Sequence, residues 1–340
     1  MNPFVPTDLL DIPAIAFFKY RNNGTIDDPI DAKTVKRYLA FYRKNPRKLF
    51  VTKERINGDK LEWIPTKLQR GFQLSKAIVK TPYQPIVKDI LALPKFHPVK
   101  QLRLQRYKKN IRDGKKNCIL FIHGYAEGTF FFHEQSYFWI FNQLLDSDIY
   151  AMELPHHHAR QPTDSPFSGA YFLNGNPVRM LEAFRQSIQE ICIFARYLKE
   201  QYDNVAIFGV SLGGHLTALS SQFIDSVRII AALASPFLFR LNPKIAPVSK
   251  SLVSKLKTEG LLGWYKILYA CNMKYFYPFT TNQKTAIIGG RYDRIVPFPR
   301  VQSLANMLQK PLFAYPGGHI SLVFWVWPLL RKIDHFFDSG

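Results

Sequence analysis

From residue 117 onward, short apolar runs alternate with longer amphipathic stretches. The runs at 118–122, 204–210 and 227–234 have the length and composition of buried strands. Residues 177–202 carry apolar side chains three and four positions apart, which is typical of a helix with one buried face. Buried strands that alternate with helices predict an α/β fold, in which a mostly parallel, doubly wound sheet is covered on both faces.

Two parts of the chain depart from this alternation. Residues 238–283 are rich in aromatic side chains and lysines, and we interpret them as a cap that is inserted between two core strands and covers the site. The alternative is a packed surface subdomain with no role in substrate selection. Residues 1–74 form a basic N-terminal extension, so we expect the domain that carries the chemistry to span residues 75–340.

Positive charge is concentrated in the first third of the chain. The net charge is +21, and residues 1–116 hold 26 of the 46 Lys and Arg but only 10 of the 25 Asp and Glu. Residues 32–50 place apolar rings at helical spacing between lysines and arginines. Three interpretations stay open: a solvated helix face, contact with an anionic membrane surface, and nucleic-acid binding, which no recognition module supports.

The strongest chemical motif is Gly209-Val210-Ser211-Leu212-Gly213, which lies between an apolar strand and a helix. A Gly-x-Ser-x-Gly string alone is a weak signal, but this context is that of a sharp strand-to-helix turn that exposes a serine oxygen. The helix N-terminus at such a turn favours developing negative charge. We therefore predict that Ser211 is a nucleophile, the alternative being an inert tight turn.

A serine hydroxyl needs a base, and the base needs a carboxylate that orients it. Asp293 and His319 each follow a predicted strand, and the carboxyl ends of parallel strands meet at one edge of a sheet. We therefore predict that His319 is the general base and Asp293 its orienting acid. Asp225 and His335 are poorer choices, because the first precedes a strand and the second ends the last helix.

The turn after the strand at 118–122 is expected to supply hydrogen-bond donors to an oxyanion. We propose the backbone N–H of Tyr125 together with that of Leu212, with Ala126 as the alternative to Tyr125. His123, at the start of the turn, is interpreted as a structural residue that orients the loop.

These motifs resemble those of the α/β-hydrolase superfamily. The resemblance covers residues 117–340, or 75–340 with the preceding strands, whereas residues 1–70 match nothing in it. It implies the α/β-hydrolase fold and a Ser–His–Asp acyl-enzyme mechanism without metal or cofactor. It also implies ester, thioester or amide substrates but does not name one, because this superfamily hosts many.

The segment Leu154–Pro162, with the sequence LPHHHARQP, is similar to a loop of a poorly characterised hydrolase subgroup. Arg160 is a candidate to bind a carboxylate or phosphate of the substrate, and His156 a candidate to contact it. Loop packing near the pocket mouth is the alternative. Three adjacent histidines suggest a metal, but neighbouring side chains of an extended segment point opposite ways, so we expect none.

The cysteines and the apolar runs of the sequence bear on the cellular compartment in which the protein is found. Cys118, Cys192 and Cys271 have neither a disulfide framework nor zinc-site spacing, which favours a reducing, cytoplasmic setting. The first 20 residues lack the basic start and clean apolar stretch of a signal peptide. The longest near-apolar run, residues 320–330, is too short to span a bilayer. We expect a cytoplasmic protein, with peripheral membrane contact if the basic helix binds lipid.

The sequence thus predicts a lipase-like serine esterase that cleaves a small-molecule or lipid ester or thioester. The alternative is a protein of the same fold that has lost activity and binds a partner or a lipid surface. Reactivity of Ser211 toward a fluorophosphonate probe separates the two.

Overall fold

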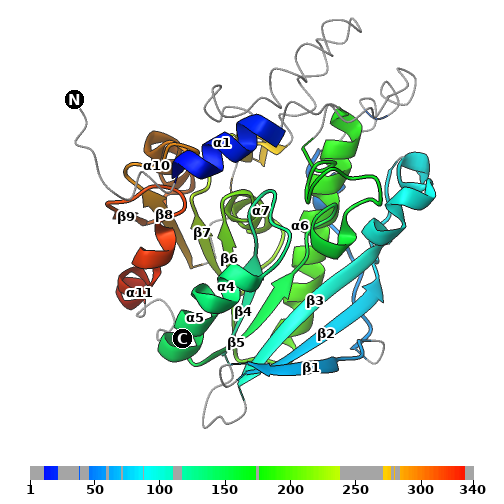
Figure 1. The fold of residues 1–340 in the computed structure, drawn as a ribbon, viewed down its shortest axis with the longest axis horizontal. Helices are drawn as coiled ribbons and strands as arrows, with labels where there is room; N and C mark the ends of the chain where they lie inside the picture. Colours follow the sequence, from blue (N-terminus) through cyan, green and yellow to red (C-terminus); the bar gives the residue numbers. More distant parts are fainter. Residues whose placement is uncertain are drawn as a thin grey trace, which may run out of the picture.

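The computed structural model of the chain describes residues 11–21, 38, 46–58, 61–69, 72–86, 88–109, 117–173, 176–237, 271–276, 279 and 284–333. These residues form a nine-stranded sheet with helices on both faces (Figure 1). The strands are β1 (Ile64–Gln69), β2 (Phe72–Lys80), β3 (Gln101–Lys109), β4 (Asn117–Ile122), β5 (Ser147–Met152), β6 (Asn204–Val210), β7 (Arg228–Ala232), β8 (Thr285–Gly290) and β9 (Leu312–Tyr315).

The strand order is β1-β2-β3-β5-β4-β6-β7-β8-β9. The strands from β5 to β9 in this order all run parallel to their neighbours. β1, β2 and β3 extend the sheet in antiparallel fashion beyond β5. The predicted α/β class with a mostly parallel sheet is therefore confirmed.

Helices cover both faces of the sheet. The described helices and 3-10 turns are α1 (Asp11–Arg21), α3 (Pro46–Phe50), η3 (Lys88–Leu91), η4 (Pro94–Lys100), α4 (Phe131–Gln135), α5 (Tyr137–Leu145), η5 (His158–Arg160), α6 (Pro177–Lys199), α7 (Leu212–Ser220), η9 (Met273–Phe276), α10 (Phe298–Leu308) and α11 (Leu322–Ile333). Side chains of α6, α7 and α10 join the core cluster on one face, and those of α5 and α11 join the cluster on the other.

The central strand β4 shows why the apolar runs of the sequence are continuous. Cys118, Leu120 and Ile122 belong to one core cluster, and Ile119 and Phe121 belong to the other. Successive side chains of a strand point to opposite faces, so a strand that is covered on both sides has no polar face.

Described strands of the N-terminal third belong to the same sheet. β1 lies entirely before residue 75 and β2 spans that position, so the strands of this sheet continue across residues 74 and 75. In α3, the carbonyl of Leu49 accepts hydrogen bonds from Arg185 Nε at 2.9 Å and Gln189 Nε2 at 3.0 Å, both on α6. Sequence pattern missed this integration because short edge strands and a one-turn helix have little periodicity.

Two predicted features lie mostly outside the described residues. Of the basic helix at 32–50, the structure describes Tyr38 and 46–50, and of the cap at 238–283 it describes 271–276 and 279. Within the described part of the chain, no helix has the length and apolar character needed to cross a membrane.

Candidate active site

Ser211 lies at a sharp turn between β6 and α7. Its φ of 58° and ψ of −117° put a residue with a side chain in a region that such residues rarely adopt. A Cβ on Gly209 would lie 2.2 Å from the carbonyl oxygen of Gly213, and one on Gly213 would lie 2.1 Å from that of Ile122. Only glycine fits at both positions, which explains their spacing around the serine.

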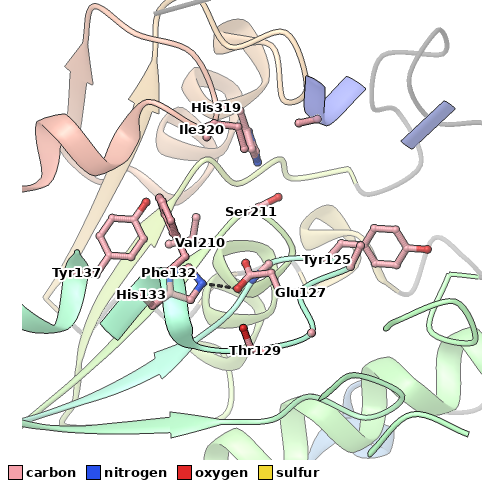
Figure 2. A pocket seen from close by; sticks show the side chains of 14 residues that line it. Tyr125, Glu127, Thr129, Phe132, His133, Tyr137, Val210, Ser211, His319 and Ile320 are labelled. Carbon is pink, nitrogen blue, oxygen red and sulfur yellow. Dashed lines mark hydrogen bonds and ion pairs between the residues drawn. The ribbon is translucent and has the colours of Figure 1, made fainter. Parts of the chain in front are cut away.

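Asp293 and His319 come together at the carboxyl ends of β8 and β9. His319 Nδ1 donates a hydrogen bond of 2.7 Å to Asp293 Oδ2, and both side chains are buried. The other oxygen of Asp293 accepts from the backbone N–H of Ile295 at 2.8 Å and of Val296 at 2.7 Å. These bonds fix the carboxylate, and the carboxylate fixes the imidazole with Nε2 outward. Figure 2 shows the His319 ring directed toward Ser211.

The electrostatics of this pair follow from its burial. Burial raises the pKa of Asp293, and the attraction of His319 only partly offsets this. Burial lowers the pKa of His319, but the charge of Asp293 and its hydrogen bond outweigh that effect and leave the pKa raised. His319 is therefore a stronger base than an ordinary histidine.

A pocket of about 380 Å³ contains both Ser211 and His319 (Figure 2). Its walls come from α1, the loop after β4, α4 and α5. The turn at Val210 and Ser211 (the serine turn) and the loop with His319 and Ile320 (the histidine loop) complete them. Phe132, Tyr137, Val210 and Ile320 give it apolar surface.

Comparisons with known proteins bear on the fold. No protein-family model and no curated protein matches this sequence. Solved structures do: an acetyl xylan esterase from Paenibacillus sp. R4 has a TM-score of 0.60 at 11% identity, covering 92% of this chain and 98% of that one. Acetyl xylan esterase 1 from Thermoanaerobacterium sp. JW/SL YS485 has a TM-score of 0.53 at 13% identity, covering 84% and 98%. An esterase from an Arctic intertidal metagenomic library has a TM-score of 0.52 at 11% identity, covering 82% of this chain and 100% of that one.

Likeness over nearly the whole length of those chains, together with the serine turn between β6 and α7, decides the architecture. This chain has the α/β-hydrolase fold. In open α/β sheets, ligands bind beyond the carboxyl ends of the strands. Ser211, Asp293 and His319 all lie at those ends, after β6, β8 and β9.

The loop after β4 passes beside Ser211. A Cβ on Gly124 would lie 3.5 Å from Ser211 Cβ, and Tyr125 is the next residue. Figure 2 shows the Tyr125 ring pointing away from Ser211. His123 Nε2 accepts from the backbone N–H of Leu154 at 3.0 Å, so its Nδ1–H donates to the carbonyl of Gly124 at 2.7 Å. Buried and bonded at both nitrogens, His123 has the loop-orienting position that was expected.

Sequence reasoning missed an acid–histidine pair in this pocket. Glu127 Oε2 is hydrogen-bonded to His133 Nε2, and Glu127 Oε1 accepts from the backbone N–H of Gly124 at 2.7 Å (Figure 2). Burial alone would raise the pKa of Glu127, but His133 and the Gly124 N–H bring it down to about 2. The pair ties the loop beside Ser211 to α4. No motif marks it in the sequence.

Asp11 on α1 was also missed. Its carboxylate accepts hydrogen bonds from the backbone N–H groups of His319 at 2.8 Å and Ile320 at 2.9 Å. The residue comes from the segment that matched nothing in the resemblance, so nothing local connects it with the histidine loop.

The predictions for Arg160 and His156 need correction. Arg160 is fully buried, and its guanidinium forms two hydrogen bonds with Glu190 of α6, at 2.7 and 2.8 Å. His156 is 1% exposed and its ring lies against Phe96 and Tyr171. Neither residue lines the pocket that contains Ser211. The arginine's carboxylate partner is internal, so this loop braces the fold.

Proposed function

We propose that this α/β hydrolase cleaves carboxylic esters, with Ser211 as nucleophile, His319 as general base and Asp293 as the acid that orients it. The observation that carries the proposal is the bond between Asp293 Oδ2 and His319 Nδ1, because it leaves Nε2 available on the side of Ser211. Both Ser211 and His319 line one pocket that can hold a substrate.

The reaction proceeds in two halves. Ser211 Oγ attacks the ester carbonyl carbon while its proton passes to His319 Nε2. The tetrahedral intermediate then expels the alcohol, which takes that proton and leaves an acyl group on Ser211. Water attacks the acyl carbon, gives a proton to His319, and releases the acid as the proton returns to Ser211.

The oxyanion of each intermediate needs donors on the backbone. The N–H of Leu212 begins α7 and has no hydrogen-bond partner among the described residues, as is usual in a first helical turn. Tyr125 follows Gly124, whose close approach to Ser211 brings this loop to the reaction site. We assign the oxyanion hole to the N–H groups of Tyr125 and Leu212, where each donor contributes roughly 10²–10³ in rate.

The acyl group is proposed to be hydrophobic, as part of a small ester, a thioester or a lipid. Phe132 and Ile320 line the pocket and are still 50% and 36% exposed, so they present apolar surface at its mouth. Phe131, next to Phe132 in α4, and Phe324, four residues after Ile320, are also exposed, at 66% and 67%. Such a rim favours apolar substrates because burying it on binding removes apolar area from water.

A fluorophosphonate probe tests the reaction class. We expect it to label the wild type and Ser303→Ala, a control on α10 outside the pocket, but not Ser211→Ala. Hydrolysis of aryl esters of increasing chain length then tests the acyl preference, with the same two variants. Absence of labelling in the wild type would favour the alternative, a binding protein that uses the hydrolase fold without its chemistry.

A further inference from the structure

Helix α1 places a buried carboxylate behind the histidine loop. Asp11, the first residue of α1, is 0% exposed and accepts hydrogen bonds from the backbone N–H groups of three residues. These are His319 at 2.8 Å, Ile320 at 2.9 Å and Arg294 at 3.3 Å. A buried carboxylate is tolerated when several N–H groups replace its hydration, and the N-terminus of its own helix adds to this.

The histidine loop has a gap that fits this carboxylate. A Cβ on Gly318 would lie 2.5 Å from Asp11 Oδ2, a distance that real structures avoid. Glycine at 318 is therefore required for Asp11 to reach the backbone of the next residue, His319.

The same helix forms part of the substrate pocket. Ala14 lies one turn after Asp11, on the same side of α1, and lines the pocket with His319 and Ile320. Figure 1 shows α1 near the loops that follow β8 and β9. The N-terminal segment thus contributes both to the pocket wall and to the support of the histidine.

We propose that Asp11 is a positioning residue of the active site, which holds the backbone of His319 so that its ring faces Ser211. This inference rests on the proposed esterase function and adds a second acid to it. Asp293 holds the imidazole of His319, and Asp11 holds the backbone N–H of the same histidine. When His319 accepts the serine proton, the charge of Asp11 also stabilises the imidazolium.

Within the described part of the chain, three acidic groups act on His319. They are Asp293 in the loop after β8, Asp11 on α1 and Glu127 in the loop after β4, which is itself paired with His133. Each of them raises the pKa of His319 against the lowering effect of burial, with Asp293 the largest and Glu127 the smallest. Removing the charge of Asp11 must therefore lower that pKa. Because the base acts when neutral, the ascending limb of activity then moves to lower pH.

The test uses the full-length chain with Asp11→Asn, Asp11→Ala and the control Ile12→Ala, which alters a residue on α1 that is 46% exposed. We expect kcat on an aryl ester to fall about 10- to 10²-fold for the two Asp11 variants, with KM nearly unchanged, because the histidine is displaced. The ascending limb of kcat/KM should also shift to lower pH. Ile12→Ala should behave as wild type.

Gly318→Ala attacks the same contact from the other side and keeps Asp11 in place. It should reproduce the loss in kcat, and the double variant Asp11→Ala/Gly318→Ala should lose little more than the worse single variant. Unfolding of an Asp11 variant would be seen by near-ultraviolet circular dichroism, and Gly318→Ala then carries the test.

The outcomes separate this inference from the function on which it rests. If the wild type fails to react with the fluorophosphonate, the esterase proposal fails. Suppose instead that the wild type reacts and that Asp11→Asn folds. If this variant then keeps its kcat and the position of the ascending limb of kcat/KM, or loses only thermal stability, the positioning role is overturned.

Discussion

Among the described residues, two acid–histidine pairs each contribute their histidine to the pocket around Ser211, and they are joined through different ring nitrogens. His319 is bonded to Asp293 through Nδ1, whereas His133 is bonded to Glu127 through Nε2. The first pair comes from the ends of β8 and β9, and the second from the loop after β4 and from α4. Similar residue types in one pocket therefore present opposite edges of the imidazole.

The difference teaches that the bonded nitrogen decides the role. In His319 the acid takes Nδ1, so Nε2, at the far edge of the ring, is left for Ser211. In His133 the acid is bonded to Nε2, and the ring stacks on that of Tyr137 with the ring centroids 5.3 Å apart. The other oxygen of Glu127 holds Gly124. In the proposed mechanism the first pair moves a proton, whereas the second pair braces a loop.

Replacing each histidine by asparagine is the strongest test of this contrast. His319→Asn should lower kcat about 10⁴-fold or more, because the general base is removed. His133→Asn should lower it at most about 10²-fold, because it only loosens the loop beside Ser211. Steady-state hydrolysis of an aryl ester measures both. Equal losses would mean that the two pairs share the chemistry.

The elements that bear the first pair could be predicted from sequence, whereas the second pair could not. The Gly-x-Ser-x-Gly turn requires glycines for local steric reasons, and Asp293 and His319 each follow an apolar strand, so strand periodicity locates them. Glu127 and His133 lie in a loop and a five-residue helix, where no periodic pattern exists.

Longer-range contacts account for the other errors. Asp11 meets His319 across 308 positions of sequence, and no local rule joins them. The guanidinium of Arg160 suits a carboxylate or phosphate, which made this residue a candidate for substrate binding. Its partner Glu190 lies on α6, and sequence alone does not show that both are turned inward.

Replacing each acid by its amide tests whether the two carboxylates have different roles. Asp293→Asn should lower kcat by roughly 10³–10⁴-fold, because the amide no longer selects the tautomer that leaves Nε2 free to accept a proton. Glu127→Gln should cost about 10-fold or less, since its amide oxygen can still accept from the Gly124 N–H. A loss for Glu127→Gln as large as for Asp293→Asn would contradict a bracing role. The same ester assay at saturating substrate decides this.

The pH dependence sharpens the comparison further. The ascending limb of kcat/KM should follow His319 and have its midpoint above the ordinary histidine value of about 6.5. Glu127 raises that pKa less than Asp11 does, so Glu127→Gln should move the limb to lower pH by less than Asp11→Asn. Profiles between about pH 5 and pH 9 measure both shifts. A limb that stays in place in Glu127→Gln would show that the charge of Glu127 does not reach His319.

The smallest expected effect is on stability, where the two acids should differ in sign. The pKa of Glu127 is lowered to about 2, so its charge stabilises the fold above about pH 4.5, and this contribution is lost as pH falls toward 2. Glu127→Gln should therefore lower the free energy of unfolding near neutral pH, on the order of 1–3 kcal/mol. The pKa of Asp293 is raised, so ionisation of this residue begins to oppose folding above the ordinary aspartate pKa and opposes it fully above the raised one.

Asp293→Asn should accordingly stabilise the fold under alkaline conditions, and the gain should vanish below the ordinary aspartate pKa. Urea unfolding under alkaline conditions, at about pH 8.5, is the suitable measurement, because alkaline pH favours the neutral form of His319, whose interaction with Asp293 is weakest. For a catalytic acid, we expect a charge that favours catalysis while opposing folding. For a structural acid, we expect a charge that favours folding. If both amide variants lose stability at that pH, Asp293 is as much a structural acid as Glu127, and the division between the pairs rests on kinetics alone.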